Sequence, residues 1–170
     1  VANPLKILVF HKNFNSIVFL DKTLSEIRSP ISLDELGLTS VQACCYSHQG
    51  AFWVLNSTSN RIQLYADNLE LLQETPVLKE LSKADEAPVM LKEHNQALYC
   101  HLPQCCILKF NRFGTPRQHH SLKNVENLQI LHGNIFYFYE GTLQKWDPKT
   151  NKKSQIPLPK KNGVWENAKL

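Results

Sequence analysis

An ungapped internal repeat constrains the fold more than any other feature of this sequence. The stretch "WVLNSTSNRIQLYADNLELL" (residues 53–72) lies over "LVFHKNFNSIVFLDKTLSEI" (residues 8–27) when the chain is shifted by 45 positions. Apolar and aromatic residues coincide in the two copies, and Asn15 coincides with Asn60. Two looser copies follow at residues 97–114 and 134–151. One structural unit is therefore predicted to recur along the chain.

Each copy has the composition of paired β-strands. Two short runs rich in Val, Ile, Phe, Tyr and Trp flank a polar turn, and a further strand-like run lies on either side of the pair in the later copies. Four strands in about 40–45 residues are typical of a propeller blade, which buries its faces only by stacking on its neighbours. We therefore predict an all-β fold of about four β-propeller blades, at approximately residues 5–38, 40–82, 87–123 and 125–159.

The turns support this division into blades. "DPKTN" from Asp147 and "NRFG" from Asn111 have the pattern of tight turns between strands. Two short helical turns are expected between blades, at residues 32–38 and 79–86.

The first copy has no strand-like run before it. Two arrangements follow: a four-bladed ring closed by residues 163–170, or the C-terminal part of a larger, six-bladed ring. We favour the larger ring, because "VWENAKL" is a poor strand sequence and an open blade edge needs a partner. Such an edge also offers a route to self-association.

The run "NPLKILVFHKNFNSIVFLD", with "FNRFGT" and "GTLQKWD" downstream, resembles a family of uncharacterised bacterial β-propeller proteins. The repeats are also similar to NHL-type six-bladed domains. The resemblance covers nearly the whole chain and implies an exported protein of the periplasm or cell envelope. It implies no particular activity.

Composition and charge narrow the classes of function. With 42% hydrophobic and 20% charged residues and a net charge of +4, the chain is typical of a globular protein. No apolar run reaches the ~18 residues that suggest a membrane span. The clearest group of basic residues lies near the C-terminus, where lysines on a solvated edge discourage aggregation, and we expect no nucleic-acid partner. The group comprises Lys149, Lys152, Lys153, Lys160, Lys161 and Lys169.

The sequence contains no local catalytic signature. The spacing of its six glycines excludes a nucleophile elbow, a dinucleotide fingerprint and a P-loop, and no two histidines have the spacing of a zinc helix. We expect no catalytic residues and no cofactor. The function that we expect is a non-catalytic binding or scaffold module for a protein or peptide partner. The alternatives are a propeller-type metal-assisted hydrolase or lactonase with a site at the channel mouth, and carbohydrate recognition by surface aromatics.

Three histidines are the leading candidates for a metal site. His48, His94 and His132 each fall between the first and second strands of a predicted blade, so they would lie at the same face of a propeller. Turns also favour His for its tolerance of unusual backbone angles. Trp165 is a candidate contact for a partner.

The five cysteines are expected to be small buried hydrophobes. Cys44 and Cys45 are adjacent, as are Cys105 and Cys106, and neighbours on a strand point to opposite faces. The stretch "CHLPQCC" lacks the spacing of a metal-binding motif, and Cys100 and His101 should face opposite sides of a strand.

His119 and His120 are expected at an exposed edge. Trp53, Tyr99, Tyr137, Tyr139 and Trp146 are expected mostly in the core between blades.

Overall fold

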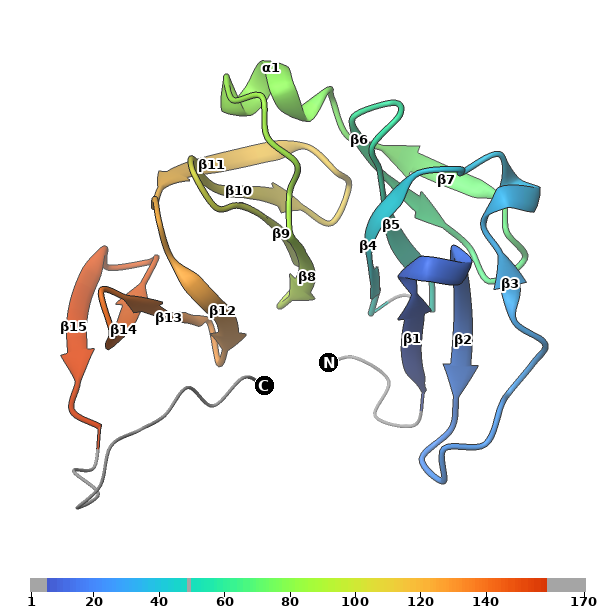
Figure 1. Cartoon of the computed structure of the whole chain (residues 1–170), viewed down its shortest axis with the longest axis horizontal. Coiled ribbons are helices and arrows are strands. Elements are labelled where there is room, and N and C mark those ends of the chain that lie inside the picture. Colours follow the sequence, from blue (N-terminus) through green and yellow to red (C-terminus); the bar gives the residue numbers. More distant parts are fainter. Residues whose placement is uncertain (1–5, 49, 159–170) are drawn as a thin grey trace. The chain divides into compact units, whose positions relative to one another are not determined.

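The computed structural model describes residues 6–48 and 50–158, which form fifteen strands in four antiparallel sheets (Figure 1). The first sheet has three strands and each of the others has four. The strands are β1 (Ile7–His11), β2 (Ser16–Leu20), β3 (Ile31–Ser32), β4 (Val41–Tyr46), β5 (Phe52–Asn56), β6 (Arg61–Tyr65), β7 (Leu71–Glu74), β8 (Met90–His94), β9 (Ala97–Leu102), β10 (Cys106–Asn111), β11 (Pro116–Ser121), β12 (Glu126–Leu131), β13 (Asn134–Tyr139), β14 (Thr142–Asp147) and β15 (Lys152–Ile156).

Within each sheet, every strand pairs with the strand next to it in sequence. The orders are β1-β2-β3, β4-β5-β6-β7, β8-β9-β10-β11 and β12-β13-β14-β15. Among the described residues, three short helices lie outside the sheets: η1 (Lys12–Phe14), η2 (Asp34–Leu36) and α1 (Leu78–Ser82). The prediction of an all-β fold built from four-stranded units is confirmed. How many blades complete the ring stays a prediction.

The chain forms two compact units, the first ending at Asn124 and the second beginning at Val125. The first unit contains the first three sheets, and the second contains the fourth. Within the described residues, no helix is both long and apolar enough to cross a membrane.

The sequence repeat is also a repeat of backbone hydrogen bonds. Leu24 N donates to Asp21 O, and 45 residues later Leu69 N donates to Ala66 O. Both leucines have the left-handed conformation, with φ of 62° and 70°. Leu33 N donates to Asn15 O, and in the same way Leu78 N donates to Asn60 O. The first two sheets are therefore copies at the level of individual turns.

The predicted tight turns are present in the third and fourth sheets. Asn111 Oδ1 accepts hydrogen bonds from the backbone N–H groups of Phe113 and Thr115, and Gly114 has a φ of +70°. Asp147 Oδ1 accepts a hydrogen bond from the backbone N–H of Lys149. In both turns a short polar side chain replaces a backbone acceptor, the role for which Asn and Asp are favoured.

Two apolar clusters hold the first unit together, and β5 contributes to both. Trp53 and Leu55 belong to the cluster between the second and third sheets, while Phe52 and Val54 belong to the cluster that also contains Phe19 of the first sheet. Because both faces of β5 are covered, all five of its residues are buried. This explains why its sequence is a continuous apolar run rather than an alternating one.

The cysteines are free thiols, and their packing follows the prediction at one pair only. Cys44 packs against the cluster of the first two sheets and Cys45 against the other cluster, as expected for neighbours on a strand. Cys105 and Cys106 instead both contact the same cluster. The strand rule does not apply to them because Cys105 lies in the turn before β10, where its N–H donates to Leu102 O.

The predicted core aromatics are buried, with one exception. Trp53, Tyr99, Tyr137 and Trp146 are all buried. Tyr139 is exposed, because it is the last residue of β13 and borders the Glu140–Gly141 turn.

Candidate functional site

The three candidate histidines lie at the predicted turns. His48 follows β4, His94 is the last residue of β8, and His132 lies between β12 and β13. His132 has a φ of 49°, so its position fits the preference of such turns for residues that tolerate the left-handed region. Whether these histidines share a ligand stays untested, and Trp165 lies outside the described residues.

His48 belongs to a hydrogen-bond cluster centred on a buried carboxylate, Glu93. The side chain of Glu93, on β8, is only 4% exposed. It accepts a hydrogen bond from the His48 backbone N–H at 3.2 Å and pairs with the His48 ring nitrogen Nδ1. Trp53 Nε1 donates to the other carboxylate oxygen at 2.7 Å. The side chain of Ser47 also hydrogen-bonds to the Glu93 carboxylate. The carboxylate therefore links the third sheet to the second.

The hydrogen bonds to Glu93 lower the pKa of its carboxyl by more than burial raises it. Burial by itself raises the pKa of this carboxyl, because it disfavours the charged form. The bonds from Ser47, Trp53 and His48 favour the charged form, and the net pKa is lowered. Glu93 is thus an ionised group whose acceptor capacity is used in joining two sheets.

A second feature is a row of turns along one end of the first unit, which we name the turn belt. It consists of residues 21–28 between β2 and β3, residues 66–72, which form the β6–β7 turn and the first two positions of β7, and residues 112–115 between β10 and β11. Arg28 Nη1 donates to Asp67 O at 2.6 Å, and Lys6 Nζ lies 2.8 Å from an Asp67 carboxylate oxygen. Gln73 Nε2, next to the belt on β7, donates to Arg112 O at 2.7 Å. These contacts place the three turns side by side.

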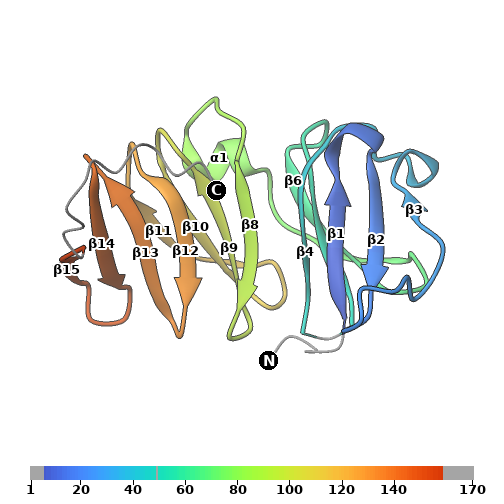
Figure 2. The same cartoon turned by 60° about the horizontal axis from the view of Figure 1, so that its bottom comes forward.

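Large apolar side chains are exposed on each segment of the turn belt. Leu24 is 68% exposed and Phe113 is 56% exposed, and Ile27, Leu71 and Leu72 are exposed as well. The Arg112 guanidinium lies 4.5 Å from the centre of the Phe113 ring. In Figure 2 the turn after β2 and the gold turn between β10 and β11 both lie along the lower edge of the first unit. The belt thus exposes several large apolar side chains at the ends of three sheets, beside charged residues such as Arg28 and Asp67.

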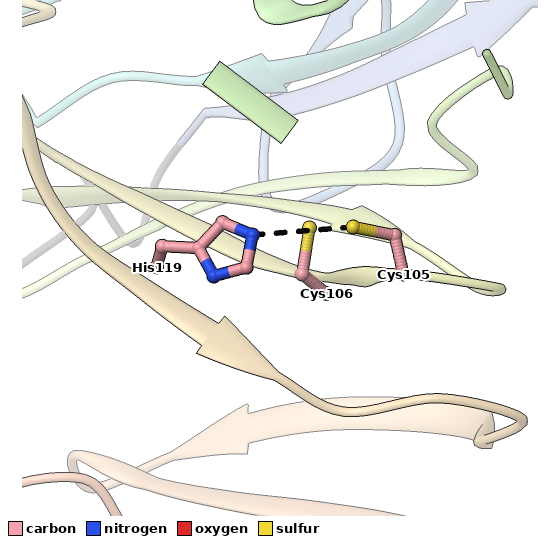
Figure 3. A group of neighbouring side chains, drawn as sticks. All are labelled: Cys105, Cys106 and His119. Carbon is pink, nitrogen blue, oxygen red and sulfur yellow. Dashed lines mark hydrogen bonds between the residues drawn. The ribbon is translucent and has the colours of Figure 1, made fainter. Parts of the chain in front are cut away.

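A third feature is a group of two thiols and one imidazole on the third sheet (Figure 3). The ligand atoms of Cys105, Cys106 and His119 all lie within 4.8 Å of one another, and Cys105 Sγ is 4.0 Å from His119 Nε2. Cys106 is buried, Cys105 is half-buried and His119 is exposed. Burial, followed by a hydrogen bond with Cys105, raises the pKa of the Cys106 thiol.

Sequence reasoning did not find this group, although it did place His119 at an exposed edge. Cys106 starts β10, and His119 on β11 pairs with Leu108, two residues farther along the same strand. Cys106 and His119 therefore share one face of the sheet, and the turn brings Cys105 onto that face. Cys100 and His101, which suggested a metal motif in the sequence, lie on β9 and are not part of the group.

No protein-family profile and no curated protein sequence matches this chain. Its structure is similar to a streptogramin B lyase, with a TM-score of 0.63 and 17% identity over 93% of this chain and 53% of the lyase. It is also similar to virginiamycin B lyase from Staphylococcus aureus, with a TM-score of 0.61 and 14% identity over 94% of this chain and 54% of the lyase. The extracellular domain of BT4673 from B. thetaiotaomicron gives a TM-score of 0.62 and 15% identity over 92% of this chain and 23% of that protein.

The chain spans about half the length of the two lyases. At these identities the similarity concerns the fold alone, and these structures are β-propellers. The chain therefore has a β-propeller fold, with about four blades.

Proposed function

We propose that this chain is a non-catalytic binding module that contacts a protein or peptide partner through the turn belt. The observation that carries the proposal is that the three segments of the turn belt, which hydrogen bonds connect, all carry exposed large apolar side chains: Leu24, Ile27, Leu71, Leu72 and Phe113. Single exposed apolar residues are ordinary, but a contiguous exposed apolar surface is typical of an interaction site.

The belt also has the rigidity that favours binding. Its turns are closed by their own backbone hydrogen bonds, such as Gly114 N to Asn111 O and Leu69 N to Ala66 O. Arg112 stacks on Phe113 and restrains that ring in an exposed position. A surface that is ordered before association loses less conformational entropy on binding.

The alternative is a propeller-type hydrolase or lactonase with a metal-assisted site at the channel mouth. Such a site needs polar side chains at the rim that can turn toward a ligand. His48, one of the rim candidates, is instead hydrogen-bonded to Glu93 through both its backbone and its ring. A carboxylate at Nδ1 is also the usual partner of a metal-ligating histidine, so the preference for the binding module rests on the turn belt and not on this pairing.

An exported protein of the bacterial envelope is the setting that we propose for this module, on the resemblance described above. The similarity to the extracellular domain of BT4673 supports this setting without identifying a partner.

Site-specific photo-cross-linking tests the proposal. A photoreactive phenylalanine analogue replaces Phe113 in one variant and Phe14 in another. Phe14 is the matched control, because it is 79% exposed but lies in the β1–β2 connection at the opposite end of the first sheet. We expect a discrete cross-linked protein or peptide from position 113 in the source cells, and its loss when Leu24 and Leu72 are changed to Ser. Equal cross-linking from both positions, or none from position 113, contradicts the proposal.

A further inference from the structure

The group formed by Cys105, Cys106 and His119 has a composition and a geometry suited to a metal ion. Thiolate sulfur and imidazole nitrogen are the ligands that Zn²⁺ prefers, at about 2.3 Å and about 2.0 Å. Tetrahedral ligands at those distances lie roughly 3.5–3.8 Å apart. The observed Cys105 Sγ to His119 Nε2 distance is 4.0 Å, and no ligand pair in the group exceeds 4.8 Å. Small side-chain rotations therefore suffice to close the site around an ion.

The backbone fixes the three ligands from two directions. Cys106 and His119 lie on one face of the antiparallel pair β10 and β11, which is in regular register from Cys106 to Lys109. Cys105 approaches from the turn, where its N–H donates to Leu102 O and its thiol lies 3.5 Å from Ser82 O. Because the turn departs from strand geometry, adjacent cysteines can present both sulfurs to the same point.

Access from solvent is built into the same face. An open depression of about 230 Å³ is lined by Leu81, residues 108–110 and residues 116–119, so it includes His119. Cys106 lies beneath the surface at 0% exposure, whereas His119 is exposed. An ion entering from this side would meet His119 before the buried Cys106.

A buried carboxylate oxygen near the group has no hydrogen-bond partner among the described residues. Glu86 Oε2 accepts a hydrogen bond from Gln104 N at 2.9 Å, next to Cys105, while Glu86 Oε1 is buried and unpaired. An unpaired buried oxygen is costly unless a cation or donor compensates it.

We propose that Cys105, Cys106 and His119 form a Zn²⁺ site with three protein ligands and one open coordination position. Binding forms two Zn–S bonds and one Zn–N bond. The two thiol protons pass to solvent, and His119 binds through its unprotonated Nε2. The site lies on the face of the third sheet, away from the turn belt, so its loss leaves the proposed binding module testable in its own right.

Co²⁺ reports this coordination directly, because thiolate ligation produces a charge-transfer band in the near ultraviolet and tetrahedral geometry produces strong visible bands. The full chain, reduced and stripped of metal, is titrated with Co²⁺ and then with Zn²⁺. We expect one equivalent of Co²⁺ to bind with both signatures and Zn²⁺ to displace it. Absence of a saturable one-to-one complex overturns the proposal.

Variants at the two accessible ligands locate the site without disturbing the core. Cys105→Ser and His119→Gln are expected to weaken Zn²⁺ binding by about tenfold or more and to change the Co²⁺ spectrum. Cys44→Ser and His120→Gln are the matched controls, and both should bind as the unmodified protein does. Thermal melting checks that each variant is folded and shows whether Zn²⁺ raises its melting temperature. If all four variants bind Zn²⁺ equally well, the ion is held elsewhere and the proposal is wrong.

Discussion

Replacing Glu93 with Gln tests whether this carboxylate holds the second and third sheets together. The substitution preserves the shape of the side chain but removes its charge and turns one of its two acceptor oxygens into an N–H donor. In the unmodified protein, the carboxylate accepts hydrogen bonds from the His48 backbone N–H, the Trp53 indole N–H and the Ser47 side chain. After the change, one of these donors faces another donor in a site that is only 4% exposed.

The expected loss in the free energy of unfolding follows from the number of hydrogen bonds to Glu93 that the substitution weakens or removes. Leaving one buried donor unpaired costs about 1–3 kcal/mol, and the remaining bonds lose the extra strength that an ionised acceptor gives them. We therefore expect Glu93→Gln to lower the free energy of unfolding by about 2–4 kcal/mol. For a protein of this size that corresponds to a fall in melting temperature of roughly 5–15 °C.

Urea denaturation at neutral pH, followed by tryptophan fluorescence, measures this difference. Glu70→Gln is the matched control, because Glu70 is exposed in the β6–β7 turn, and its effect should stay within about 0.5 kcal/mol. The midpoint of unfolding should shift while its slope stays the same. If Glu93→Gln is as stable as the control, the carboxylate does not join the sheets and the reasoning fails.

Three further predictions use the same measurements. The folded-state pKa of Glu93 is lowered, so the stability that its charge contributes is fully present above the ordinary value of 4.5 and is lost as the pH falls through the lowered pKa. When unfolding is measured at decreasing pH, the difference in stability between the unmodified protein and Glu93→Gln should therefore narrow below about pH 4.5, and a difference that widens would contradict the prediction. Trp53→Phe should couple to Glu93→Gln by about 0.5–3 kcal/mol in a double-mutant cycle, whereas strict additivity would mean that the indole bond contributes nothing. Gly114→Ala and Gly141→Ala should each cost about 1–2 kcal/mol, because both glycines have positive φ and a Cβ at position 114 would make only an ordinary van der Waals contact with Thr75, at 3.4 Å; a loss at position 114 well above that at position 141 would contradict this.

The blade architecture could be predicted because it is encoded locally and repeatedly. The alignment of Asn15 with Asn60 and Leu24 with Leu69 reflects equivalent turns, and all four residues have positive φ. Leucine has no intrinsic preference for that conformation, so no single copy would have indicated it. The repeat made the equivalence visible, whereas the propensity of each residue would not have done so.

The Glu93 cluster could not be predicted in the same way. His48 was selected from its turn, but its partner lies 45 residues away on the next sheet. The sequence "MLKEH" of β8 gives no indication that its glutamate is buried. One signal was available: Glu93 and Trp53 both lie near the ends of strands that border the same rim, where an indole N–H and a carboxylate can meet.

The thiol–imidazole group escaped prediction for a different reason. Alternation of side chains along a strand argued against adjacent cysteines sharing a ligand, and this holds for Cys44 and Cys45. The alternation does not apply to Cys105, because β10 starts at Cys106 and Cys105 lies in the turn before it. The contact with His119 depends on the cross-strand register, which places His119 opposite Leu108 and which only the folded sheet reveals.

Equivalent backbone hydrogen bonds recur every 45 residues in the first two sheets, and this bears on how such a chain can gain or lose a blade. The bonds Leu24 N to Asp21 O and Leu33 N to Asn15 O each begin and end within one repeat, as do their counterparts at Leu69 and Leu78. A genetic duplication or deletion of one such segment would therefore leave the main-chain bonding of every remaining blade intact. Only the side-chain ties between blades, such as the one at Glu93, would have to be rebuilt by later mutation.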